Sequence, residues 1–182
     1  MILRSNARNC RGFSLIELLI VVAIIGILAT LAIPEFAAYR LRAFNAVALS
    51  DLNNLQKTQG SMATDWQEFG LTTNAGGAVA AHGNGLILLG PGLSHYGIAG
   101  VKSFLQLSLS NNVSLVANTD GTTGKSFTLL SKHLHGIRIY GSDSDVTGTY
   151  FLGSVANRSL AATGVTVPSV PNTLDFPGWS LL

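Results

Sequence analysis

The pattern of hydrophobic and polar residues separates a short N-terminal segment from a long apolar one. Residues 1–12 are polar and basic, whereas residues 13–33 are apolar apart from Ser14, Glu17 and Thr30. At about 1.5 Å of rise per residue, a helix over the apolar segment reaches roughly 30 Å, the thickness of the hydrocarbon core of a bilayer. The pattern therefore predicts a helix that can span a membrane.

An amphipathic pattern continues over residues 34–59. Pro34 lacks a backbone donor and disfavours helical geometry at Ile33, so we expect a kink or a local break there. Beyond it, apolar residues recur every three or four positions, as on one helix face: Ala37, Leu41, Phe44, Ala48, Leu52 and Leu55. Polar residues lie largely off this stripe: Arg40, Arg42, Asn45, Asp51 and Asn54. Together the two segments predict one long helix whose second half needs a covering partner.

The remainder of the chain predicts a loop followed by a β-rich head. Residues 60–100 are rich in Gly, Ala and Asn with little periodicity, which indicates a long connecting loop. Over residues 101–182, apolar and β-branched runs alternate with turn sequences: FLQLSL, VSLVA, FTLLS, IRIY and TYFLG. The Asp120-Gly121 pair is a hairpin signal, and the proline-containing tail is expected to be extended. These elements make an α+β chain.

Composition and charge support one folded head with an apolar appendage. Charged residues are 11% of the 182 residues, well below the roughly 25% of a typical soluble domain, and the apolar excess lies in 13–33. Arg4, Arg8 and Arg11 precede the apolar segment, which is typical of a targeting leader and favours a cytoplasmic N-terminus. The only cysteine, Cys10, lies in that leader, so its removal would leave no thiol for a disulfide.

The junction between leader and apolar segment indicates an unusual processing step. An ordinary secretory signal is cut beyond its apolar core, which is then discarded. Here Gly12 lies between the basic residues and the apolar run. A cut after Gly12 would remove the charges and keep the hydrophobic helix on the mature protein.

The sequence RGFSLIELLIVVAIIGILATLAIPEFAAY, from Arg11 to Tyr39, resembles the N-terminal signature of type IV prepilins and of type II secretion pseudopilins. The resemblance implies that a prepilin peptidase cuts between Gly12 and Phe13 and that Phe13 is then N-methylated. It also places Glu17 at the acidic fifth position of the mature chain. The continuation after Tyr39 is more similar to type IVa pilins than to pseudopilins. Further along, the resemblance is architectural and implies the pilin fold, a long helix packed against a small antiparallel sheet.

The resemblance implies a structural subunit of a type IV pilus, a polymeric surface fibre for adhesion, surface motility or DNA uptake. The implied partners are identical subunits, the prepilin peptidase and the inner-membrane assembly machinery. The precursor would cross the inner membrane once before entering an extracellular fibre. A pseudopilin or a minor pilin is the alternative within this family. A membrane-anchored ligand-binding or enzymatic domain is the alternative from another class.

Glu17 is the residue of the apolar segment that needs a physical explanation. A carboxylate inside an apolar membrane helix costs about 2.5 to 3.5 kcal/mol on insertion scales, so it calls for a cation. The α-amino group of a mature Phe13 lies about one turn away, and we hypothesise that Glu17 pairs with that of a neighbouring subunit and sets the register of assembly. The alternative is that Glu17 caps the first turn of the helix, which is compatible with such a pair.

Small and helix-breaking residues of the apolar segment are further assembly candidates. Gly26 lies among small residues that permit close approach of helices, although such residues are also ordinary in membrane helices: Ala23, Ala29 and Ala32. We expect Gly26 and Pro34 to let the helix between them extend or melt in the fibre. Once out of the membrane, an apolar helix must be buried against identical helices.

Two weaker patterns concern metals. Asp143 and Asp145 offer hard oxygen ligands for calcium, although a solvated loop that closes a hairpin explains the same spacing and is the favoured interpretation. His133 and His135 stand at strand spacing, so both can project from one face, but no further ligand is evident nearby. No other cofactor is indicated.

A last pattern concerns nucleic acid and catalysis. Four cations of the head are candidates for a basic strip that would bind DNA: Lys125, Lys132, Arg138 and Arg158. They are scattered over a nearly neutral head, so a solvated surface is the favoured interpretation. We find no nucleophile with a base partner, no phosphate-binding loop and no metalloprotease motif, so an enzyme is not expected.

Overall fold

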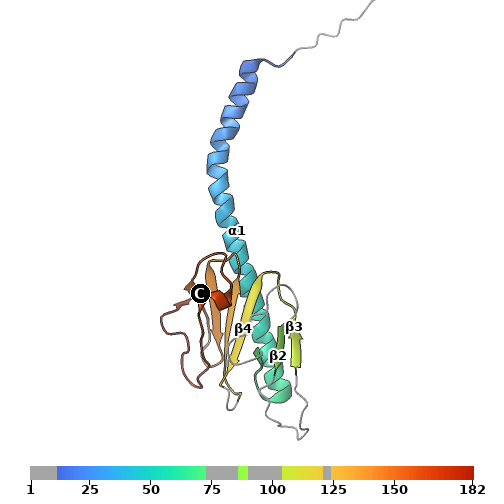
Figure 1. Ribbon diagram of the computed structural model, residues 1–182, viewed down its shortest axis with the longest axis vertical. Coiled ribbons are helices and arrows are strands. Elements are labelled where there is room, and N and C mark those ends of the chain that lie inside the picture. The colour runs from blue at the N-terminus through green and yellow to red at the C-terminus, as the bar shows by residue number, and fades with distance from the viewer. Residues whose placement is uncertain (1–11, 73–85, 90–103, 121–123) are drawn as a thin grey trace, which may run out of the picture. The chain divides into compact units, whose positions relative to one another are not determined.

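The computed structural model describes residues 12–72, 86–89, 104–120 and 124–182. The chain divides into two compact units, Met1–Tyr39 and Arg40–Leu182. The first contains the N-terminal part of a long helix, and the second contains the rest of that helix and the strands (Figure 1).

Helix α1 runs without interruption from Leu15 to Trp66. A local break at Pro34 is therefore absent, although Pro34 cannot donate a hydrogen bond to the carbonyl of Thr30, four residues earlier; the alternative expectation, a kink, stays a prediction. One missing bond is a local loss, and the turns on either side keep their own. The helix also continues past residue 59, because Gly60 does not end it and the buried side chain of Met62 gives the next turn a place in the core.

The predicted loop over residues 60–100 is corrected further by two strands. Strand β1 (Leu71–Thr72) pairs antiparallel with β2 (Leu86–Leu89), which pairs antiparallel with β3 (Phe104–Leu107). These form a three-stranded sheet in the order β1-β2-β3. The Gly- and Ala-rich composition hid the LILL run, whose pairing partners lie on either side of it in the chain.

The head is built on a five-stranded antiparallel sheet in chain order. Its strands are β4 (Val113–Thr119), β5 (Phe127–His133), β6 (Arg138–Asp143), β7 (Thr149–Gly153) and β8 (Ser180–Leu181). The predicted α+β fold, a long helix with a small antiparallel sheet, is confirmed. The β4–β5 hairpin is also present, but Thr119 pairs with Phe127, so its connection is longer than a two-residue turn, and Gly121 lies outside the described residues.

One face of this sheet packs on the second half of α1. Successive residues of a strand point to opposite faces, and Leu115, Leu129 and Tyr140 share one core cluster with Leu52 and Leu55 of the helix. Most of the predicted stripe is thus confirmed: Ala48, Leu52 and Leu55 are buried, and Leu41 and Phe44 are half-buried, whereas Ala37 is exposed. The partner that the stripe required is the sheet.

The opposite face of the sheet is covered by the C-terminal tail. Val116, Leu130 and Ile139 form a second cluster with tail residues that include Val167 and Phe176. The tail also contains the short helix α2 (Leu160–Thr163), with Ser159 at its N-cap and Gly164 in a left-handed C-cap. The predicted extended tail therefore serves as a second layer over the sheet.

Phe176 fills a hollow that depends on Gly141. A Cβ atom built on Gly141 would lie 2.3 Å from Cε1 of Phe176, far inside van der Waals contact. The Phe176 ring also stacks on Tyr150, with centroids 5.4 Å apart, and meets Trp179 edge-on at 4.9 Å. Because residue 141 has no side chain, the Phe176 ring can pack directly on the sheet and hold the tail against it.

Candidate processing and assembly segment

The predicted processing site lies immediately before α1. Gly12 and Phe13 are both exposed, and a Cβ atom built on Gly12 would meet no atom within 4 Å. The side chain of Phe13 is 85% exposed. The peptide bond between these residues is therefore in an open stretch of chain, whereas residues 1–11 lie outside the described residues.

Glu17 and Ser14 form a capping box at the start of the helix. The Ser14 amide donates to Oε2 of Glu17 at 2.9 Å, and the Ile16 amide donates to Oγ of Ser14 at 3.2 Å. Both bonds satisfy amides that have no helical partner in the first turn. Glu17 therefore has the capping role considered above. Its carboxylate is bonded to the amide of Ser14, the residue that directly follows Phe13.

The first half of α1 presents apolar side chains in every direction. Exposed large hydrophobic residues occupy most positions from Leu15 to Ile33, each with about half or more of its surface accessible. Among the described residues, α1 is the one helix long and apolar enough to cross a membrane, by length and composition. Such a surface has to be covered by lipid or by other protein.

Gly26 and Pro34 both lie within this helix. A Cβ atom built on Gly26 would meet no atom within 4 Å, so the described chain itself offers no close neighbour there. Near Pro34, the hydroxyl of Thr30 donates to the carbonyl of Ile27 at 2.7 Å. Their predicted assembly roles stay predictions.

Three polar side chains of α1 join the helix to the rest of the head by hydrogen bonds. The sequence analysis placed two of them off the apolar stripe and did not consider the third. Asn45 accepts from the Ile137 amide at 3.0 Å, and both carboxylate oxygens of Asp51 accept from Ser110 at 2.8 and 2.9 Å. Gln59 bonds both backbone groups of Gly70, at 2.6 and 2.7 Å. Asn45, Asp51 and Gln59 are all buried, although Asn45 and Asp51 lie off the apolar stripe.

The predicted histidine pair lies beside α1. The ring of His133 stacks on Phe44 with centroids 4.5 Å apart, and its Nδ1 accepts from the His135 amide at 3.1 Å. His135 in turn contacts the Asn157 side chain through its own Nδ1 at 2.6 Å. No cluster of three or more His, Cys, Asp or Glu side chains gathers as a metal site in the part of the chain that the structure describes. These contacts make the pair a packing element.

The surroundings of His133 disfavour its charged form. Burial is the largest cause that lowers its pKa from the ordinary histidine value, followed by the neighbouring charges of His135 and Lys132. A hydrogen bond with the backbone of Asn111 and the carboxylate of Asp51 raise the pKa by smaller amounts.

The calcium candidates serve as acceptors for backbone amides. Asp143 accepts from the amides of Asp145 and Asp175 at 3.0 and 3.1 Å, and Asp145 accepts from that of Asn172 at 2.6 Å. The two carboxylates therefore fasten the β6–β7 connection to the tail. This arrangement corrects the expectation of a merely solvated loop, since Asp143 is buried.

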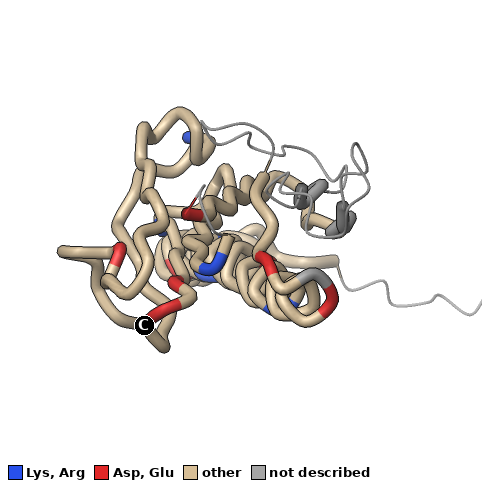
Figure 2. Tube along the Cα trace, turned by 90° about the horizontal axis from the view of Figure 1, so that it is seen from below, with Lys and Arg blue, Asp and Glu red and all other residues tan. Residues whose placement is uncertain are grey.

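The basic strip is not a continuous surface. Lys132 is fully buried, its Nζ donates to the carbonyls of His133 and Gly136, and burial lowers its pKa. The guanidinium of Arg138 lies 4.5 Å from the centroid of Phe151, and Lys125 donates to the carbonyl of Gln67. Along the backbone trace of the described residues, the Lys and Arg positions are separate from one another (Figure 2). The expected solvated position of Lys132 is wrong because β5 is covered on both faces.

Comparison with known proteins finds similarity to one family in the N-terminal part of the chain. Residues 7–33 match the family model described as the prokaryotic N-terminal methylation motif. This motif, the long helix and the antiparallel sheet together confirm the resemblance to type IV pilins.

Individual relatives agree with that class. The chain is 43% identical over 81 residues to the type IV major pilin protein PilA of Myxococcus xanthus, a match that covers 44% of this chain and 36% of that protein. It is 54% identical over 52 residues to the type IV wide pilus major component PilA4 of Thermus thermophilus, covering 29% and 40%. It is 45% identical over 58 residues to a fimbrial protein of Pseudomonas aeruginosa, covering 32% and 38%. The chain thus spans about two fifths of the length of these relatives.

Proposed function

We propose that this chain is the precursor of a structural subunit of a type IV pilus. The observation that carries the proposal is the apolar first half of α1, which has no covering partner within the described chain and begins directly after Gly12 and Phe13. A peptidase that cuts between these residues would leave the helix on the mature protein. The methylation motif over residues 7–33 supports this cut and the N-methylation of Phe13.

Assembly follows from the burial that this helix requires. In the inner membrane, lipid covers the apolar residues between Leu15 and Ile33. After extraction, identical helices of neighbouring subunits take the place of lipid, and the fibre core consists of former membrane anchors. The small residue Gly26 allows those helices to approach closely, and Pro34 marks the point at which the helix can change length.

Glu17 gives the assembly its register. A mature Phe13 has a positive α-amino group, and an axial stagger of subunits brings the Glu17 of one subunit to the Phe13 amine of the next. Both charges would otherwise enter an apolar core unpaired, which is strongly destabilising. The Glu17 carboxylate is already directed back toward the chain start by its bond to the Ser14 amide.

Under this proposal the precursor lies in the inner membrane with its N-terminus in the cytoplasm, and the mature subunit lies in an extracellular fibre. Adhesion, surface motility and DNA uptake are the activities proposed for that fibre. The dispersed cations of the head give no support to DNA binding by the single subunit. A pseudopilin of a type II secretion system remains the second candidate, since the methylation motif serves both.

The test is electron microscopy of filaments sheared from cells, with mass spectrometry of their main component. We expect a chain that begins with methylated Phe13 and lacks residues 1–12. A cell surface without filaments, combined with a periplasmic form cut at the same bond, would favour the pseudopilin. A main component that retains Met1, or is cut beyond Ala32, would contradict the proposal.

A further inference from the structure

The five-stranded sheet gives the head two ends. Strand β6 begins at one of them, where the Ile137 amide donates to Asn45 at 3.0 Å. Asn45 lies in the second turn of the compact unit Arg40–Leu182, so the chain enters the unit at this end, which we call the near end. Strand β6 finishes at the opposite, far end with Asp143, which pairs with Thr128 at the start of β5.

Exposed arginines occupy the near end. Arg40 and Arg42 lie in the first turn of the unit, and the guanidinium of Arg40 lies 5.6 Å from the centroid of the Phe44 ring. Arg158 is also exposed, and the residue before it contacts His135, whose ring centroid lies 5.5 Å from that of Phe44. These arginines therefore gather at one end although they are distant in the sequence.

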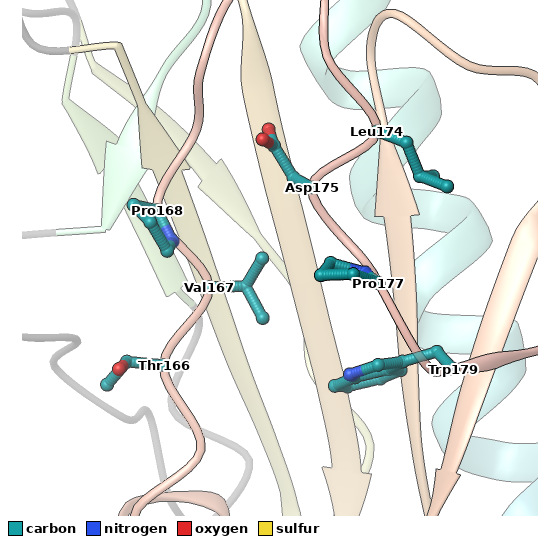
Figure 3. Close-up of a pocket in the computed structure, with 7 residues that line it drawn as sticks. All are labelled: Thr166, Val167, Pro168, Leu174, Asp175, Pro177 and Trp179. Atoms are coloured by element: carbon teal, nitrogen blue, oxygen red, sulfur yellow. The ribbon is translucent and has the colours of Figure 1, made fainter.

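Aspartates occupy the far end. Asp143 accepts from the amides of Asp145 and Asp175, so the three acids lie together where β6 ends. In Figure 3 the carboxylate of Asp175 is turned away from the indole of Trp179, and it accepts from the Val170 amide at 2.9 Å. An ionised carboxylate has about four acceptor sites, so bonds from neutral amides leave these charges able to meet a cationic partner.

The last turn of α1 adds to the acidic character of the far end. Asp65 is exposed there, and the following segment is joined to the start of β5 by the Phe69 amide, which donates to the carbonyl of Gly124 at 2.9 Å. Two exposed lysines share this half of the head, Lys57 and Lys125. The described acids of this half outnumber them: Asp65, Glu68, Asp120, Asp143, Asp145 and Asp175.

The near end has no accessible acid among the described residues of the head. Asp51 is the acid of the head nearest to Arg40 in the chain, and it is buried with both oxygens accepting from Ser110. Arg138 adds a further cation, half-buried over the ring of Phe151. The head therefore has a positive near end and a negative far end.

This charge arrangement favours a second copy of the chain as the partner. A membrane surface or a nucleic acid would attract the cations and repel the acids, so it would explain one end only. A translation along the helix axis brings the near end of one head to the far end of another, where opposite charges meet. Such a contact is heterologous, and it repeats without closing when each copy is displaced along one axis.

We propose that the arginines at the near end of one head dock on the aspartates at the far end of the next head in the fibre. The inference rests on the proposed function, since an axial stack of subunits supplies the translation. Exposed ion pairs contribute little individually and are screened by salt. The contact therefore sets the spacing and orientation of the heads, while the apolar helices supply most of the association energy.

Cysteine crosslinking tests which ends meet. Residues 13–182 contain no cysteine, and two neutral, exposed positions flank the charges: Val155 after β7 at the near end and Thr147 between β6 and β7 at the far end. Filaments of the Val155→Cys/Thr147→Cys variant are treated with a bis-maleimide of about 10 Å, shorter than the roughly 20 Å that a strand of the length of β5 puts between the ends of one head. We expect a ladder of covalent oligomers on a denaturing gel, whereas each single variant should stop at the dimer.

Charge variants of this double-cysteine chain test what holds the ends together. Arg158→Glu should lower the crosslinked fraction about threefold or more, because a repulsive pair replaces an attractive one. Asp65→Asn combined with Asp145→Asn should also lower it, since asparagine keeps an acceptor oxygen without the charge. Lys57→Glu is the matched control, with the same change of charge in the acidic half, and should not lower it. Raising the salt to about 1 M should weaken the crosslinking of the unaltered charges.

Three results would overturn the proposal while leaving the pilus function intact. These are filaments without a ladder, a ladder that Arg158→Glu does not reduce, and a ladder that responds to Arg158→Glu but not to the aspartate variants. The last result would assign the arginines to another surface, such as anionic lipid. Absence of wild-type filaments from cells that process the subunit would instead contradict the proposed function, and this inference with it. Circular dichroism verifies that each variant is folded.

Discussion

The carboxylate of Glu17 accepts a hydrogen bond from the backbone amide of Ser14 at 2.9 Å, so the first acidic residue of the apolar helix reaches back toward its beginning. This bond is possible for a neutral glutamine as well as for a glutamate, because both offer a side-chain oxygen at the same distance from the backbone. The capping role and the charge-pairing role of this residue can therefore be separated by substitution.

Glu17→Gln should keep the cap but lose the charge, and Glu17→Val should lose both. If Glu17 pairs with the α-amine of Phe13 in the fibre, both variants should be cleaved normally and both should reduce filament yield, on the order of tenfold or more, because an amine remains unpaired in an apolar core. The measurement is the amount of sheared filament against the amount of processed subunit in the membrane. Normal filament yield from Glu17→Gln with a defect in Glu17→Val would assign the residue to capping alone.

Gln59→Leu should destabilise the head by about 2 kcal/mol or more, because the backbone N–H and C=O groups of Gly70 would both lose their buried partner. Urea unfolding of the detergent-solubilised chain, followed by near-ultraviolet circular dichroism, measures this change. Gln56→Leu, at an exposed position on the same helix, is the matched control and should change stability by less than about 0.5 kcal/mol. Equal effects at the two positions would refute the anchoring role.

Gly141→Ala should cost about 1 to 3 kcal/mol, because the added methyl group occupies the space of the Phe176 ring. Gly153→Ala, in the next strand, meets no atom within 4 Å and should have little effect. Phe176→Leu makes room for the methyl group, so the double variant should be more stable than the sum of the two single changes predicts. Strict additivity would show that the ring and the glycine are not coupled.

The stability of the head should fall as the solution is acidified through the range in which histidine titrates. Burial lowers the pKa of His133 below its ordinary value, so between the two pKa values the unfolded chain binds more protons than the folded chain. Stability is therefore complete above the ordinary histidine pKa and is lost toward the lowered one. The charged and titratable groups that act on this ring are Lys132, His135 and Asp51.

His133→Phe keeps a ring against Phe44 and should remove this part of the pH dependence. Unfolding free energies at about pH 7.5 and about pH 5, compared between this variant and the wild type, give the measurement. A wild type whose loss on acidification equals that of the variant would exclude His133 as the cause.

The sequence was sufficient for the elements whose pattern is local. The apolar and amphipathic halves of α1 follow from residue spacing, and the runs from FLQLSL to TYFLG all contain strands because β-branched and apolar residues alternate with turn residues. The methylation motif needed no structure, since its information lies in the order of residues 7–33.

What the sequence missed depends on tertiary partners. The change in composition at Gly60 predicted the end of the helix, but the buried Met62 continues it. Asn45 lies off the apolar stripe, and its burial depends on the hydrogen bond from the distant Ile137 amide. Lysine is ordinarily found at the surface, but Lys132 lies in β5, which α1 covers on one face and the C-terminal tail covers on the other. In each case a contact between residues distant in sequence overrides a local tendency.

The packing of the Phe176 ring against Gly141 also determines which solution conditions can destabilise the head. Residues 13–182 contain no cysteine, so an aromatic side chain, and not a disulfide, holds the C-terminal tail on the sheet. A reductant has no disulfide to break there, and folding of these residues requires no thiol oxidase. Heat and denaturant weaken apolar contacts, so these are the conditions that would separate the C-terminal tail from the sheet.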